Sequence, residues 1–175
     1  MTLSNLTRPI VLTSRTTILA SALALATLPA LAGTAATGDD AASRNLEIVR
    51  GAFDRWSAGG SVFEILSPHV SWTIHGSGPV AGTYDGIVDF TQRASRPLVS
   101  RLAEPLVPEV HDIWAVGDTV IIRFDASSTT TSGQPYQNQF VWIFRLEDGE
   151  VAEAEAFLDL AAYQEVVDNN EPRSD

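Results

Sequence analysis

The second half of the chain alternates apolar and polar residues over four segments separated by short turns, and this pattern constrains the fold more than any other feature. The segments are 107–114, 119–130, 136–146 and 151–158, and the turns hold Gly117-Asp118, Ser132-Gly133 and Asp148-Gly149. A period of two sends successive side chains to opposite faces of a strand, and turns this short join antiparallel neighbours. The pattern predicts an antiparallel four-strand meander with one apolar face.

The preceding segment predicts helices and one more strand. Leu46, Val49, Phe53 and Trp56 recur at helical spacing before Gly59-Gly60. A short helix is expected over 61–66, a strand over 70–75, a helix over 87–94 that Pro97 interrupts, and a last helix over 159–167. Two to three N-terminal helices against a curved antiparallel sheet give an α+β fold that leaves one largely apolar pocket at an end of the sheet.

Residues 1–32 have the layout of a secretory signal peptide. Arg8 and Arg15 precede a largely apolar run over 18–31, and Ala30-Leu31-Ala32 offers a cleavage site. A membrane span needs about 20 apolar residues, so a signal peptide is favoured over an uncleaved anchor or a core helix. We therefore expect export, with cleavage near Ala32 and no stable membrane insertion afterwards. A linker over 33–44, a single domain over 45–168 and a polar tail over 169–175 complete the expected organisation.

Composition excludes several classes of function. The chain has no cysteine, so disulfides, iron–sulfur clusters and thiolate zinc sites are excluded. A net charge of −11 argues against nucleic acid as a partner. No spacing of His, Asp or Glu predicts a metal site, and no phosphate-binding loop or catalytic triad motif is present, so neither a metal nor a cofactor is expected.

Several short segments, in this order and spacing, resemble one known family. They are 70–72, 78–86, 136–138, 144–151 and 157–159. Over 45–167 the chain resembles SnoaL-like and ketosteroid isomerase-related proteins of the nuclear transport factor 2-like superfamily. The resemblance implies a cone-shaped fold around an apolar pocket, and it implies a homodimer formed through the sheet. The superfamily includes isomerases, cyclases, epoxide hydrolases, dehydratases and non-catalytic binders, so it does not by itself assign an activity.

The catalytic residues of these relatives are only partly matched. Ile74 stands where the ketosteroid isomerases have their aspartate base, and Ala52 and Trp142 stand where they have their oxyanion-binding tyrosine and aspartate. The Arg-x-Asp pattern of limonene-type epoxide hydrolases is kept by Arg123 and Asp125. The second aspartate of those enzymes is matched by Ala156, and their tyrosine and asparagine are matched by Trp72 and Ile74.

Arg123 and Asp125 are therefore the predicted catalytic residues. Their i, i+2 spacing places both on one face of a strand, and the resemblance places that face in the pocket. The alternative is a structural or exposed ion pair.

The predicted ligand-binding residues are Trp72, Ile74, Asn138, Phe140 and Trp142. Bulky rings suit an apolar or planar ligand, although core packing would explain them equally well. Asn138 could present its amide to a ligand or bond to backbone at the sheet rim. The expected function is an exported pocket protein that acts on or binds a small apolar molecule. It is either an isomerase, cyclase or hydratase, or a non-catalytic ligand-binding or assembly domain.

Overall fold

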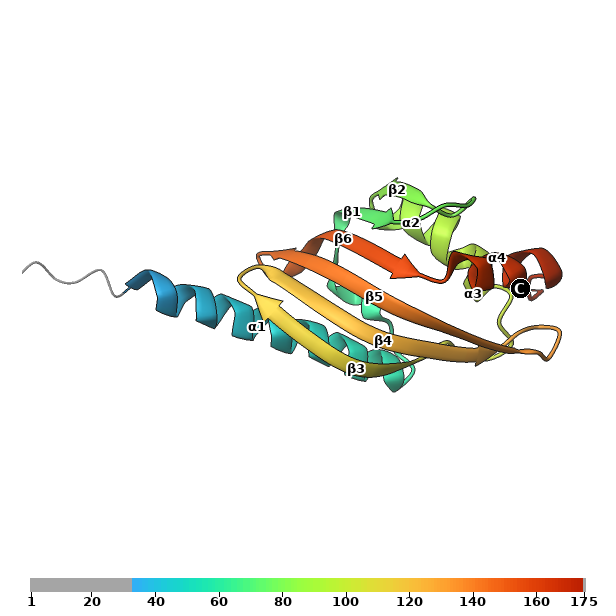
Figure 1. Ribbon diagram of the computed structural model, residues 1–175, viewed down its shortest axis with the longest axis horizontal. Coiled ribbons are helices and arrows are strands. Elements are labelled where there is room, and N and C mark those ends of the chain that lie inside the picture. The colour runs from blue at the N-terminus through green and yellow to red at the C-terminus, as the bar shows by residue number, and fades with distance from the viewer. Residues whose placement is uncertain (1–32, 175) are drawn as a thin grey trace, which may run out of the picture. The chain divides into compact units, whose positions relative to one another are not determined.

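The computed structural model describes residues 33–174, and the predicted signal peptide lies outside them (Figure 1). The first helix, α1, spans Gly33–Ser57, so the expected linker over 33–44 is helical. Val49, Ala52 and Phe53 of α1 are buried, and the helix lies against β3 and β4. It ends at Ser57, and Gly59 just beyond it has a φ of 94°, the left-handed conformation that glycine adopts after helix C-termini.

The remaining helical segments are short. A 3₁₀ turn, η1, covers Val62–Ile65, where Ser61 Oγ accepts a hydrogen bond from Phe63 N. Next come α2 (Ile87–Phe90), the π-helical turn η2 (Thr91–Ser95) and α3 (Arg96–Val99), which form one continuous helical segment. The last helix, α4, covers Leu160–Asn169 and is capped by the Asp159 carboxylate. No helix in this described part is long and apolar enough to span a membrane.

Pro97 lies inside the helical segment that it was expected to interrupt. A proline has no N–H, and an α-helix interior normally loses a hydrogen bond at such a residue. Here the chain widens into the π-helical turn, where Arg96 N donates to Thr91 O, and Pro97 then occupies the first turn of α3. The Ala94 carbonyl of this turn accepts a hydrogen bond of 2.8 Å from the Tyr163 hydroxyl.

Six strands form one curved sheet in the order β2-β1-β6-β5-β4-β3. Their bounds are β1 Leu66–Ile74, β2 Gly82–Asp85, β3 Val107–Val116, β4 Thr119–Thr129, β5 Pro135–Glu147 and β6 Glu150–Leu158. The predicted meander over β3 to β6 is confirmed. The expectation of a wholly antiparallel sheet is wrong, because β1 pairs in parallel with β6 and the sheet is mixed.

Strand register gives the sheet two distinct faces. On the inner face, one row of side chains crosses four strands. It consists of Ile122 of β4, Trp142 of β5, Ala156 of β6 and Ile74 of β1, each opposite the next. These residues are buried, and the helices cover them. On the outer face, the side chains of Ile121, Arg123 and Asp125 and their cross-strand neighbours are partly exposed. Small Ala156 between two larger side chains leaves space above the inner face, and this space is part of the pocket.

The predicted polar tail is tied to the domain by hydrogen bonds. Ser132 Oγ donates to Asn170 Oδ1 over 2.7 Å, and Thr131 Oγ1 donates to Glu171 O over 2.8 Å. Arg173 N donates to Ser100 O over 2.7 Å. These contacts bring the tail to the pocket mouth.

Candidate functional site

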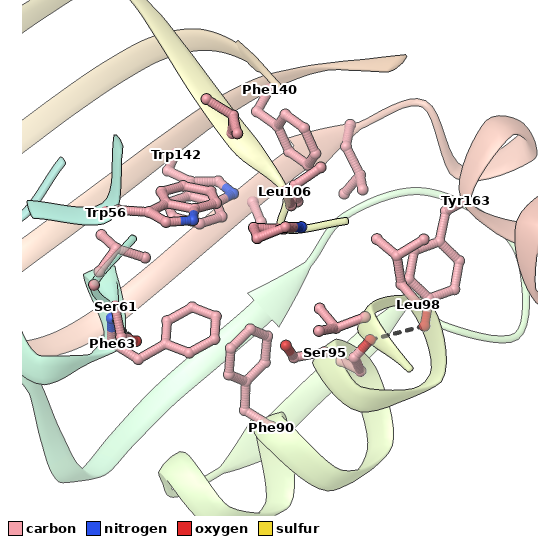
Figure 2. A pocket seen from close by; sticks show the side chains of 18 of the residues that line it. Trp56, Ser61, Phe63, Phe90, Ser95, Leu98, Leu106, Phe140, Trp142 and Tyr163 are labelled. Carbon is pink, nitrogen blue, oxygen red and sulfur yellow. Dashed lines mark hydrogen bonds between the residues drawn. The ribbon is translucent and has the colours of Figure 1, made fainter. Parts of the chain in front are cut away.

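The inner face of the sheet and the helices that cover it enclose a cavity of about 550 Å³ (Figure 2). Its wall is mostly apolar and draws on α1, η1, the helical segment 87–99, the chain before β3, and strands β1, β5 and β6. The aromatic lining residues are Trp56, Phe63, Trp72, Phe90, Phe140, Trp142 and Tyr163. This volume falls in the range of small-molecule sites, which are about 300–1,000 Å³.

The aromatic side chains of the wall hold one another in fixed orientations. Trp72 stacks on Phe90 with ring centroids 4.0 Å apart and meets Trp142 edge to face at 5.1 Å. Trp56 lies parallel to Trp142, with centroids 5.9 Å apart and an interplanar angle of 5°. Figure 2 shows these two indoles at one side of the cavity and Phe63 and Phe90 at another. A wall of interlocked rings is rigid, and it presents flat apolar surfaces to a ligand.

Polar groups in the wall are few, and two of them, Tyr163 and Ser61, already form hydrogen bonds within the protein. Tyr163 donates its hydroxyl proton to Ala94 O, and burial above all raises the pKa of its phenol, so the group stays protonated. Ser61 Oγ accepts from the chain, as described above. Glu104 and Arg173 are the carboxylate and the guanidinium of the lining, and both are exposed at the mouth. Among the described residues, no group of three or more His, Asp or Glu side chains could hold a metal ion.

Four of the five predicted ligand-binding residues line this cavity. Trp72, Ile74, Phe140 and Trp142 do so, and each is also at least nine-tenths buried. The sequence offered ligand binding and core packing as alternatives for these rings. The side chains belong both to the core and to the pocket wall, so the two alternatives are compatible.

Asn138 does not line the apolar cavity. Its Nδ2 donates to Tyr136 Oη and Asp159 O, and its Oδ1 accepts from the backbone N–H groups of Gln139 and Asp159. Both donors and both acceptor positions of the amide are thus used. The side chain fastens β5 to the start of α4, which is the rim alternative considered above. Burial raises the pKa of neighbouring Tyr136 to about 12, so its hydroxyl also stays protonated.

Arg123 and Asp125 form the predicted ion pair, but on the opposite face of the sheet. Arg123 Nη1 donates to Asp125 Oδ1, and His111 Nε2 lies 3.2 Å from Asp125 Oδ2. Phe124 between them is fully buried on the inner face, so alternation turns both charged side chains outward. The expectation that they face the cavity is wrong, and neither lines it.

The pair nevertheless has an electrostatic signature. The hydrogen bond from Arg123, aided by the one with His111, lowers the pKa of the Asp125 carboxyl. Arg123 also borders a second, more open depression on the outer face, together with Gln137, Gln139 and Phe157. The structure thus assigns the pair to the outer surface of the sheet.

The other charges of the outer face are paired along the strands. Arg145 lies between Glu147 and Glu153, and its hydrogen bond lowers the pKa of the Glu153 carboxyl. His75 Nε2 lies 2.7 Å from Glu155 Oε2, and its ring stacks on Phe157 at 4.5 Å. Glu153, Glu155 and His75 therefore face away from the pocket.

Sequence reasoning missed part of the wall. Trp56 was predicted only as part of the apolar face of a helix, and Phe90 falls within the helix predicted over 87–94. Helical spacing was the signal available for both. Phe63 and Leu106 come from the 3₁₀ turn and from the irregular chain before β3, where no periodicity marks a buried side chain. Their place in the pocket depends on how these segments meet the sheet.

Comparison with known proteins agrees with this architecture. Residues 49–154 match the SnoaL-like domain, whereas no curated protein matches the chain. A nuclear transport factor 2-like protein from Burkholderia thailandensis E264 is 20% identical with a TM-score of 0.58, covering 70% of this chain and 95% of its own. A SnoaL-like polyketide cyclase candidate from Jannaschia sp. CCS1 is 21% identical with a TM-score of 0.58, covering 75% and 96%.

TerC, co-crystallised with polyporic acid, is 19% identical with a TM-score of 0.58 and covers 72% of this chain and 99% of its own. At these identities the structural matches establish a shared fold. The family model extends over more than half of the chain, from α1 to β6. The chain belongs to the SnoaL-like domain family.

Proposed function

We propose that the domain binds a small, largely apolar molecule with a ring system in the aromatic cavity. The observation that carries this proposal is a cavity of about 550 Å³ that is partly open to solvent and whose wall includes seven aromatic side chains. Filling such a space would bury most of the surface of a ligand of two to four fused rings. Stacked and edge-to-face contacts with fixed rings favour a flat ligand over a flexible aliphatic one.

The polar groups of the wall favour binding over acid–base catalysis inside the cavity. A general acid or base must lie within hydrogen-bond reach of the reacting group and needs a pKa near the working pH. The described wall offers Tyr163, Glu104 and Arg173 as ionisable groups. The first is committed to Ala94 O with a raised pKa, and the other two lie at the mouth.

A relative gives independent support. TerC shares the fold and was crystallised with a small molecule, polyporic acid. The scaffold is therefore compatible with small-molecule binding in at least one protein of this shape, and the aromatic wall supplies the means here.

Native mass spectrometry and calorimetry test the proposal. In native mass spectrometry, the protein purified from its own host is expected to carry a bound small molecule. In calorimetry, the protein freed of that molecule is expected to bind fluorene. Leu106→Trp places a larger side chain in the cavity wall and should weaken fluorene binding by about tenfold or more. Val116→Trp adds the same side chain at a position that is 75% exposed and outside the wall, and it should leave binding unchanged. Equal binding by the two variants, or no binding by the wild type, would refute the proposal.

A second candidate is an isomerase or cyclase that uses the same cavity, and Glu104 at the mouth is the observation that favours it. This carboxylate lines the pocket and could exchange a proton with a substrate that projects from it. If a copurified molecule is turned over, Glu104→Gln should abolish turnover and keep binding, since the two side chains have the same shape. Full turnover by this variant would remove the candidate.

We further propose that the protein is exported after cleavage near Ala32. The basic start, the apolar run and the small-x-small site support this. Sequencing the N-terminus of the protein recovered from its host decides it, because a chain that starts at Met1 would contradict export.

We also propose a homodimer formed through the outer face of the sheet. Trp114 and Phe157 on this face are 50% and 43% exposed, and Ile121 and Ile143 lie between them on β4 and β5. Sedimentation of the wild type should give a dimer and that of Trp114→Arg a monomer. Val88→Arg, at a position that is 61% exposed on α2, is the matched control and should remain dimeric.

A further inference from the structure

Indole nitrogens are the least expected polar atoms of the cavity wall. Trp56, Trp72 and Trp142 all line the cavity. An indole N–H can only donate a hydrogen bond. None of these three finds an acceptor within residues 33–174. A mostly apolar wall thus contains donors that have no acceptor among the described residues.

The three nitrogens differ in what they can reach. Trp72 Nε1 is sealed from solvent and cavity alike, among the rings of Phe63, Phe90 and Trp142. Trp56 is only half-buried, so water can reach its ring. Trp142 is 6% exposed as a residue, yet its nitrogen is not among the sealed atoms. Because Trp142 lines the cavity, its N–H opens toward that space.

The ring of Trp142 is held in place from several sides. Its centroid lies 4.8 Å from that of Phe124, 5.8 Å from that of Phe53 and 5.9 Å from that of Trp56. Figure 2 shows the stacked pair of Trp56 and Trp142, with the nitrogen of Trp142 at the end of the ring turned toward the other labelled residues. A donor held this firmly loses little freedom when a ligand binds, so its hydrogen bond is made at low entropic cost.

We infer that Trp142 is the specificity-determining residue of the cavity, whose N–H selects ligands that carry an acceptor oxygen on the ring system, such as aryl ketones. This inference rests on the proposed function, since it assumes that a ring-containing molecule enters the cavity. The acceptor replaces water at the Trp142 nitrogen, and the flat remainder of the ligand lies against the neighbouring rings. A molecule of the same shape without the oxygen leaves that donor unpaired and binds more weakly.

Other donors of the wall are less suited to this task. The hydroxyl proton of Tyr163 is engaged by Ala94 O. Arg173 is exposed at the mouth, where water competes for it. Ser95 is half-buried and lines the cavity, and its side chain makes no hydrogen bond to any residue that the structure describes, so it is the competitor that the experiment must separate from Trp142.

A pair of matched probes isolates the hydrogen bond. Fluorene and 9-fluorenone have the same tricyclic skeleton and differ by the carbonyl oxygen. Calorimetry on the wild type should give about tenfold tighter binding for 9-fluorenone, the usual size of one net hydrogen bond. Replacing Trp142 with 3-benzothienylalanine keeps the bicyclic shape and removes the N–H, and it should bring the two affinities together.

The same replacement at two other tryptophans provides the controls. At Trp72, whose nitrogen is sealed, and at Trp114, which lies on the outer face, the preference for 9-fluorenone should persist. Ser95→Ala should also keep it. In ¹H–¹⁵N spectra, 9-fluorenone should move the indole signal of Trp142 downfield, and fluorene should not.

The possible results separate this inference from the proposed function. Equal binding of both probes by the wild type, or a preference that survives loss of the Trp142 N–H, overturns the inference and leaves the proposed function standing. If Ser95→Ala loses the preference for 9-fluorenone while the Trp142 replacement keeps it, the selecting donor is the Ser95 hydroxyl, and the inference about Trp142 is overturned. Failure of both probes to bind overturns the inference and the proposed function together.

Discussion

Replacing Trp72 with alanine should remove a large part of the stability of the domain. The side chain is 1% exposed, stacks on Phe90 and meets Phe63, Trp142 and Phe144 edge to face. Truncation of a buried tryptophan to alanine costs about 3–5 kcal/mol of unfolding free energy. The native indole N–H is buried without an acceptor, an arrangement that itself costs about 1–3 kcal/mol and is relieved by truncation. We therefore expect the loss at the lower end of the range, about 3 kcal/mol.

Urea unfolding followed by far-ultraviolet circular dichroism measures this loss. With a slope of about 2 kcal/mol/M, a loss of about 3 kcal/mol lowers the midpoint by about 1.5 M. Trp114→Ala is the matched control, because that side chain is 50% exposed on the outer face, and it should cost less than about 1 kcal/mol. Trp72→Phe, which keeps a ring against Phe90 and removes the unpaired N–H, should cost less than Trp72→Ala. Equal losses in the Trp72→Ala and Trp114→Ala variants would refute the assignment of Trp72 to the core.

Three further predictions concern the hydrogen bonds described above. Arg123→Leu and Asp125→Asn should destabilise the protein less in combination than the sum of the single changes, and strictly additive effects in a double-mutant cycle would contradict the direct contact. Because the pKa of Asp125 is lowered in the folded state, its contribution to stability is present above the ordinary carboxyl pKa and is lost as pH falls through the folded value. Wild type should thus lose more stability than Asp125→Asn when urea midpoints are compared from neutral to acid pH. Asn138→Ala removes four hydrogen bonds, two within β5 and two to Asp159 at the start of α4, and should cost about 2–4 kcal/mol, with increased amide exchange in α4. A neutral effect would show that the amide does not fasten this helix.

The strands and helices were predictable because their signals are local. Alternation over 119–130 reflects a strand with one buried face, and the structure has β4 over Thr119–Thr129. The turns at Gly117, Gly133 and Gly149 have positive φ angles, as the short hairpin connections require. The spacing of Val49, Phe53 and Trp56 likewise predicts the apolar face of a helix, and it can be read from residues in neighbouring turns of that helix alone. The helix over 33–44 was missed because that segment is small and polar, with no apolar stripe.

The candidate site was predictable only in part. The pocket was expected to contain Trp72, Phe140 and Trp142, and all three line it. Bulky side chains on the apolar face of a strand are buried against the helices, on the side where the pocket lies. Asn138 shares that face but lies beyond the cavity, where β5 meets α4. Leu106, in an irregular segment, reaches the wall without any periodic signal.

The sequence by itself determined which residues of each strand share a face, because side-chain direction alternates with a period of two. Only the tertiary structure decided which of the two faces of β4 meets the helices. Phe124 lies opposite Phe140, and Asp125 lies opposite Gln139, so the register between β4 and β5 places the Arg123–Asp125 pair outside. The parallel pairing of β1 with β6 and the cavity were also decided at this level. Register and enclosure depend on contacts between residues far apart in the chain, and a local pattern carries no information about them.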